Sequence, residues 1–170
     1  MTDENFEYIF SQIGKPVTLR SAGGGEQSPA AAALPLALTG FLGEFGRCQF
    51  LDGMLNVVHP SDLQSLADMV FERDKDLGGR KTLPFAYSVF GTIYFWHAEY
   101  GVGDVNLVTG QVTCEGLVSQ NDDKSNLANT VYVPFMLERE SHDLFDDLDK
   151  PLFKRALKLR LVVACEQSLW

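Results

Sequence analysis

The sequence has 170 residues, 45% apolar and 22% charged, and its 12 Phe, 5 Tyr and 2 Trp are enough for a folded core, which excludes wholesale disorder. Its formal net charge of −9 argues against a nucleic-acid partner, because binding phosphates requires clustered Lys and Arg. The length fits one domain over residues 1–170. The acidic N-terminus and the lack of a long apolar stretch predict a cytoplasmic protein with no membrane partner.

Three segments in the first half of the chain have the pattern of amphipathic helices. Residues 3–13, 35–45 and 61–74 carry apolar side chains at intervals of three and four residues. Ser61 with Gln64 three positions later predicts the N-terminal cap of the third helix. The apolar stripe predicted to be buried on this helix consists of Leu63, Leu66, Ala67, Val70 and Phe71.

Two segments rich in aromatic and β-branched residues predict strands. Residues 47–58 contain an Asp-Gly pair, which is a strong hairpin signal, and residues 83–117 predict four strands in series. Together they predict a twisted antiparallel sheet with helices packed against it, which is an α+β fold. Residues 21–33 contain three consecutive glycines and predict a flexible segment, and residues 119–126 predict a polar loop.

Charge is distributed unevenly along the chain. Residues 150–160 hold five bases and no acids within a final helix expected at 150–163, whereas residues 1–149 hold nine bases and 22 acids, a net charge of −13. One hypothesis is that these bases pair with the acidic body, where exposed pairs contribute about 0–1 kcal/mol each. The other is that they support head-to-tail self-association.

The residue types that usually carry catalysis or metal binding are sparse and separated. The odd number of cysteines, far apart in sequence, predicts buried free thiols at Cys48, Cys114 and Cys165. None of the histidines has metal-ligand spacing or lies near a candidate nucleophile in sequence, which predicts structural roles for His59, His97 and His142. We therefore predict no catalytic residues, no metal and no cofactor.

The densest group of carboxylates lies in residues 138–149, which contain six acids and one base, Arg139. Such a group suits a solvated surface, acid/base chemistry, cation binding or docking of a basic protein, although the spacing does not match a calcium loop. We favour docking over catalysis. The candidate partner-binding residues are Glu99, Asp104, Asp122, Asp123, Asp143, Asp146, Asp147 and Asp149.

An ordered series of motifs resembles a known family. LTGFLGEFGRCQFLDGMLNVVHPSDLQSLADMVFE (38–72) is followed by LPFAYSVFGTIYFWHAEYGVGDVNLVTGQV (83–112) and, more loosely, by HDLFDDLDKPLFKRALK (142–158). This series resembles the GAD-like family, whose members include immunity proteins of the bacterial type VI secretion system. The sequence departs from the family at Thr92, where an acid is common. It also ends soon after PLFKRAL, which suggests a truncated or rearranged C-terminus.

The resemblance implies that the chain is an immunity protein that binds a cognate secreted toxin, often a nuclease, without catalysis. The charge agrees with this expectation, since an acidic protein can occupy the basic surface with which a nuclease holds phosphates. Two alternatives remain open. One is a small cytoplasmic enzyme that uses the 138–149 carboxylates for acid/base chemistry, and the other is an adaptor protein.

Overall fold

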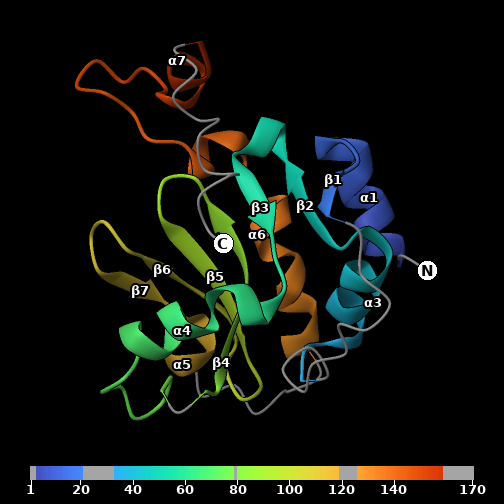
Figure 1. The fold of residues 1–170 in the computed structure, drawn as a ribbon, viewed down its shortest axis with the longest axis vertical. Helices are drawn as coiled ribbons and strands as arrows, with labels where there is room; N and C mark the ends of the chain where they lie inside the picture. The colour runs from blue at the N-terminus through green and yellow to red at the C-terminus, as the bar shows by residue number, and fades with distance from the viewer. Residues whose placement is uncertain (1–2, 21–32, 79, 119–125, 159–170) are drawn as a thin grey trace.

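The computed structural model describes residues 3–20, 33–78, 80–118 and 126–158. These residues form a seven-stranded antiparallel sheet in which every strand pairs with its neighbour in sequence (Figure 1). The strands are β1 (Val17–Arg20), β2 (Arg47–Phe50), β3 (Leu55–Val57), β4 (Thr82–Ser88), β5 (Thr92–His97), β6 (Gly101–Asn106) and β7 (Gln111–Thr113). The predicted α+β class is confirmed.

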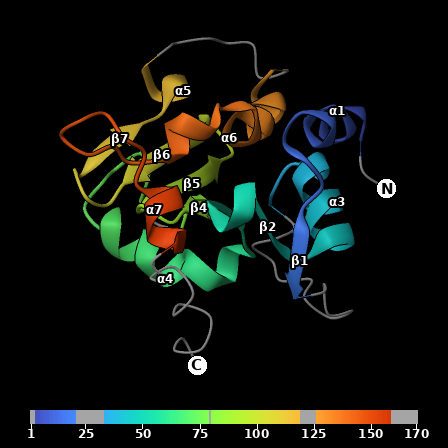
Figure 2. The ribbon, with the colours of Figure 1, turned by 90° about the horizontal axis from the view of Figure 1, so that it is seen from above.

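The helices lie on both faces of the sheet. They are α1 (Glu4–Ile13), α3 (Leu36–Phe45), α4 (Pro60–Val70), α5 (Glu115–Val118), α6 (Val133–Met136) and α7 (Phe153–Lys158), with 3-10 helices η1 (Leu51–Gly53), η2 (Leu127–Tyr132) and η3 (Arg139–His142). In Figure 2, α4 and α6 lie on opposite sides of β4 and β5. Within the described ranges, no helix combines the length and apolar character that crossing a bilayer requires.

Alternation along β5 explains this layering. Tyr94 and Trp96 point into the larger cluster, which α1, α3 and α6 cover, whereas Ile93 and Phe95 point into a smaller cluster beneath α4. Successive strand residues face opposite sides of a sheet, so a strand buried on both sides is apolar almost throughout. The aromatic run that predicted β5 therefore reflects a central strand.

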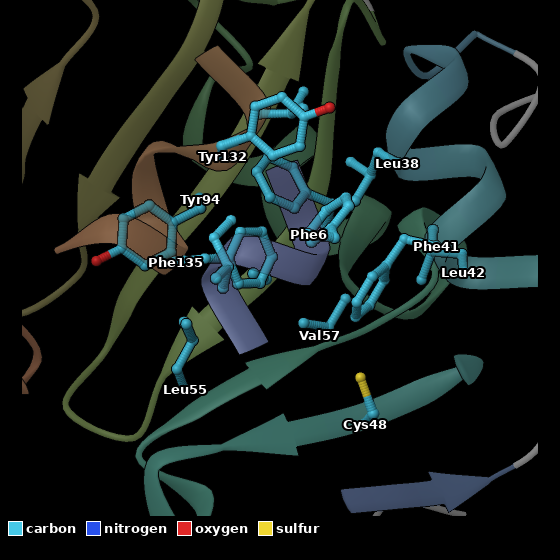
Figure 3. Packing of buried hydrophobic residues seen from close by; sticks show 14 of the residues in the cluster. Phe6, Leu38, Phe41, Leu42, Cys48, Leu55, Val57, Tyr94, Tyr132 and Phe135 are labelled. Atoms are coloured by element: carbon cyan, nitrogen blue, oxygen red, sulfur yellow. The ribbon is translucent and has the colours of Figure 1, made fainter. Parts of the chain in front are cut away.

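The larger cluster is built around the fully buried ring of Phe6 (Figure 3). Its centroid lies 4.5 Å from that of Phe41, 5.0 Å from Tyr132 and 5.5 Å from Phe135. These contacts join α1 to α3, η2 and α6. Because tilted and edge-on aromatic pairs add to the stabilisation from burial, Phe6 ties the N-terminal helix to the rest of the core.

Close packing also explains a glycine in β6. A side chain at Gly103 would place its Cβ 2.5 Å from Cζ of Phe95 and 2.7 Å from the carbonyl oxygen of Thr113. Phe95 is directly opposite Gly103 in the register and is fully buried. The glycine therefore makes room for an aromatic ring between neighbouring strands.

Several predicted boundaries needed correction. Strand β1 was not predicted, because it is short and lies at the sheet edge, where Val17 remains exposed. Residues 115–118 form a helix rather than the end of a strand. The final helix, expected at 150–163, is described only as α7, and residues 159–163 lie outside the described ranges. The flexible segment expected at 21–33 also falls outside them, apart from residue 33.

Helix α4 begins differently from the prediction. His59, rather than Ser61, is its N-cap: His59 Nδ1 accepts a hydrogen bond from Ser61 N at 3.3 Å, and Asp62 accepts one from His59 N at 3.0 Å. Pro60 then occupies the first turn, which suits its fixed φ. The predicted burial of Val70 was also wrong, since 38% of its surface is exposed.

Candidate functional site

Four of the acids in 138–149, namely Asp143, Asp146, Asp147 and Asp149, lie in a short hairpin that projects from one end of the molecule beside α7 (Figure 1), whereas Glu138 and Glu140 precede it at η3. We call residues 143–151 the acidic hairpin. Its arms meet where Phe145 bridges Pro151 and where Asp146 N donates to the Lys150 carbonyl at 3.0 Å. The segment is therefore a defined turn within the described chain.

Two of its carboxylates organise the turn itself. Asp143 Oδ1 accepts hydrogen bonds from the amides of Leu144 at 2.8 Å and Phe153 at 3.0 Å. The second bond ties the start of the hairpin to the first residue of α7. Asp143 therefore has a structural role that its position in an acidic run did not predict.

Asp146 stabilises the turn through hydrogen bonds to its backbone and an ion pair. Its Oδ1 accepts from the amides of Leu148 at 2.9 Å and Lys150 at 3.0 Å, and its Oδ2 forms an ion pair with Arg155 of α7. The two backbone hydrogen bonds lower the pKa of Asp146, and Arg155 lowers it further. Arg155 is thus one base of the final helix that pairs locally with the acidic segment.

The outward surface of the hairpin combines charge with apolar side chains. Asp147 and Asp149 are exposed, and between them Leu148 has 72% of its surface exposed. Leu144 and Phe145 are 41% and 44% exposed. We did not predict these apolar residues as functional. The sequence did offer a signal for them: the Asp-rich segment contains three large apolar residues whose spacing matches neither a buried helix face nor a buried strand face.

The base of the hairpin is fixed to the sheet. Tyr94 Oη of β5 lies 3.1 Å from Nδ1 of the buried His142, the residue that precedes the hairpin. On the other side, the buried ring of Phe153 packs edge-on against Phe90 with centroids 6.4 Å apart. Arg139 lies over the Phe153 ring at 5.6 Å. The hairpin is therefore mounted on the end of the sheet where β4 turns into β5.

The remaining candidate residues do not join this group. Glu99 lies in the turn after β5, at the opposite end of that strand from Phe90. Asp104 lies opposite Tyr94 on β6, and burial raises the pKa of its carboxyl. Asp122 and Asp123 lie outside the described residues. The structure thus brings together four of the eight predicted carboxylates.

The histidines lie in the core, each with a local contact. His97 Nδ1 accepts from Glu99 N at 3.2 Å, and its ring stacks on Tyr100 with centroids 4.5 Å apart. Burial lowers the pKa of His97 and of His142. Across the described ranges, no three His, Cys, Asp or Glu side chains are grouped so as to hold a metal ion.

The cysteines within the described ranges are free and buried, as predicted. Cys48 faces the larger cluster and Cys114 the smaller one. Burial raises the pKa of the Cys48 thiol to about 12, so this thiol stays protonated and unreactive near neutral pH. Cys165 lies outside the described residues.

A family model described as the GAD-like domain matches residues 4–108, which is more than half of the chain. The chain belongs to the GAD-like family. The GAD-like match spans α1 to β6 and ends before the acidic hairpin, so the hairpin lies outside the matched range.

A comparison with solved structures supports the fold. The structure described as "Crystal structure of Atu4351 from Agrobacterium tumefaciens" is similar, with a TM-score of 0.78 and 23% sequence identity. The alignment covers 91% of this GAD-like chain and 69% of that chain. At this identity the likeness concerns the fold alone. A comparison with functionally curated proteins gave no match.

Proposed function

We propose that this GAD-like chain is an immunity protein that binds a toxin of the type VI secretion system and blocks it without catalysing a reaction. The observation that carries the proposal is the acidic hairpin, a preorganised turn that presents exposed carboxylates and exposed apolar side chains together. Protein interfaces combine apolar centres with polar rims, and this hairpin has both within a few residues.

The negative net charge of the chain supports a partner with a basic surface. A nuclease toxin exposes basic side chains to hold nucleic-acid phosphates, and an acidic protein can occupy the same surface. The net charge of −9 would also speed the encounter with such a toxin. We therefore propose a cognate toxin with a basic surface, most simply a nuclease, met in the cytoplasm.

The rival acid/base enzyme fits the hairpin less well. A general acid that works near neutral pH needs a raised pKa, whereas hydrogen bonds from Leu148 and Lys150 lower the pKa of Asp146. Asp143 is likewise engaged with two backbone amides. Carboxylates used in this way support a binding surface rather than a reaction centre.

A protection assay tests the proposal. The candidate toxin is the protein encoded directly beside this chain in its genome, expressed from an inducible promoter in a susceptible host. We expect cells that co-express this chain to survive induction, and cells that carry an empty vector to die. Survival must require a soluble complex of the two proteins. An adaptor without a toxin partner would give neither protection nor a complex with the neighbouring gene product.

A further inference from the structure

We propose that the tip of the acidic hairpin, Asp147-Leu148-Asp149, enters the toxin. Leu148 would fill an apolar pocket, and the two carboxylates would meet Lys or Arg side chains on its rim. This inference rests on the proposed immunity function and names the surface and the partner chemistry that the function requires.

Exposed apolar side chains are grouped on the hairpin. Leu144, Phe145 and Leu148 are three large exposed apolar residues within five consecutive positions. Single exposed apolar residues are ordinary on protein surfaces, but grouped ones mark interaction sites. Leu148 is the most exposed of the three and lies at the turn, so it reaches furthest into a partner.

The backbone of the tip is held in shape before binding. Asp146 accepts hydrogen bonds from the amide of Leu148 inside the tip and from the amide of Lys150 just after it. The Asp146 carboxylate is itself held by Arg155 of α7. A loop that is already ordered loses less conformational entropy on binding, so more of the contact energy appears as affinity.

The charge of the tip identifies the partner that it binds. The side chains next to Leu148, Asp147 and Asp149, are both exposed acids. A second copy of this chain carries a net charge of −9, and Arg155 of its basic helix α7 is already paired with Asp146 of its own hairpin. A pocket with a basic rim would attract the two carboxylates of the tip, and a nuclease binds phosphates with a basic surface of this kind. The toxin therefore fits the tip better than a second copy does.

The test measures dissociation constants between the full chain and the neighbouring toxin, inactivated at its own catalytic residue. We expect Leu148→Ser to raise Kd by about 30-fold, as for an interface hot spot. The matched control is Met69→Ser on α4, because Met69 is 73% exposed and Leu148 is 72% exposed. Met69→Ser should leave Kd within about twofold of wild type.

The charged rim is tested by association rates. The double variant Asp147→Asn/Asp149→Asn should slow association at low salt and weaken its salt dependence, because exposed charges act mainly on the association rate. The control removes two acids far from the hairpin in sequence, Glu7→Gln/Glu72→Gln. Equal effects of the two double variants would mean that only net charge matters, which would overturn the assignment of the tip.

Other outcomes overturn the inference in distinguishable ways. If wild type binds the toxin and Leu148→Ser binds equally well, the tip is not the interface while the immunity function stands. If wild type does not bind, the proposed function fails first. A wild-type dimer in sedimentation that Leu148→Ser abolishes would assign the tip to a second copy. Protection of Leu148→Cys from maleimide in the free chain would mean that this chain already covers the tip.

Discussion

The hydroxyl of Tyr94 lies 3.1 Å from Nδ1 of His142 and joins the central strand β5 to the residue at the base of the acidic hairpin. Both residues are buried, so neither group has ready access to water in its place. We expect Tyr94→Phe to lower the free energy of unfolding by about 1–3 kcal/mol, because it leaves a buried ring nitrogen without this partner. Denaturant unfolding measures the change, and an unaltered midpoint would show that the contact is not stabilising.

Acid should destabilise the fold in a defined pH window. Burial lowers the folded-state pKa of His97 and His142, whereas the unfolded chain keeps values near 6.5. For His142, the carbonyl of Pro134 opposes this shift without reversing it. Below about pH 6.5 the unfolded state therefore binds more protons than the folded state, and stability falls as pH falls.

The expected slope is up to about 1.4 kcal/mol per pH unit for each histidine within that window. Unfolding curves at pH 7.5 and 5.5 measure it, and His142→Gln should reduce the difference between them. The contribution of Asp146 appears in a different window, since a carboxyl with a lowered pKa adds stability that is lost only below about pH 4. Stability that is flat between pH 7.5 and 5.5 would contradict the neutral state of the buried histidines.

The two kinds of aspartate in the hairpin should respond differently to substitution. Asp146→Ala removes the acceptor of two backbone amides and the partner of Arg155, so the amides of Leu148 and Lys150 should exchange hydrogen faster. Asp147→Ala should leave these exchange rates unchanged, because the structure gives its exposed side chain no role in the turn. Equal exchange rates in both variants would contradict the assignment of Asp146 as the organiser.

Helix α4 offers a matched pair for its buried face. Leu66 packs against the smaller cluster with Phe71, whereas 38% of the surface of Val70 is exposed. We expect Leu66→Asp to cost more than about 2 kcal/mol because it places a charge in an apolar setting. Val70→Asp should cost about 0.5 kcal/mol or less. Comparable losses in thermal unfolding would show that the orientation of α4 is wrong.

Patterns among neighbouring residues were sufficient to predict most of the helices and strands. The periodicity of 3–13 predicted α1, and the Asp-Gly pair at 52–53 predicted the β2–β3 hairpin because the turn needs positive φ, which Asp52 and Gly53 adopt. The two-sided aromatic run predicted β5. In each case the feature depends on residues that are close together in sequence.

Features that depend on contacts between residues far apart in the chain could not be predicted from the sequence. Strand β1 exists because β2 pairs with it, and Val70 is the last residue of α4, where 38% of its surface stays exposed. His59 was overlooked as a cap because imidazole is rarely one. The charge of the hairpin segment could be predicted from the sequence. The fold determines that Asp146 accepts hydrogen bonds within the turn and that Leu148 is exposed.

The immunity function is tested most directly by measuring whether this chain and the neighbouring toxin form a complex. Isothermal titration of the full chain into the inactivated toxin measures this without relying on cell survival. We expect saturable binding with one chain per toxin and an affinity that weakens as salt rises, because opposite charges meet at the interface. A titration without heat of binding at low salt, repeated at a second temperature, would contradict the immunity function.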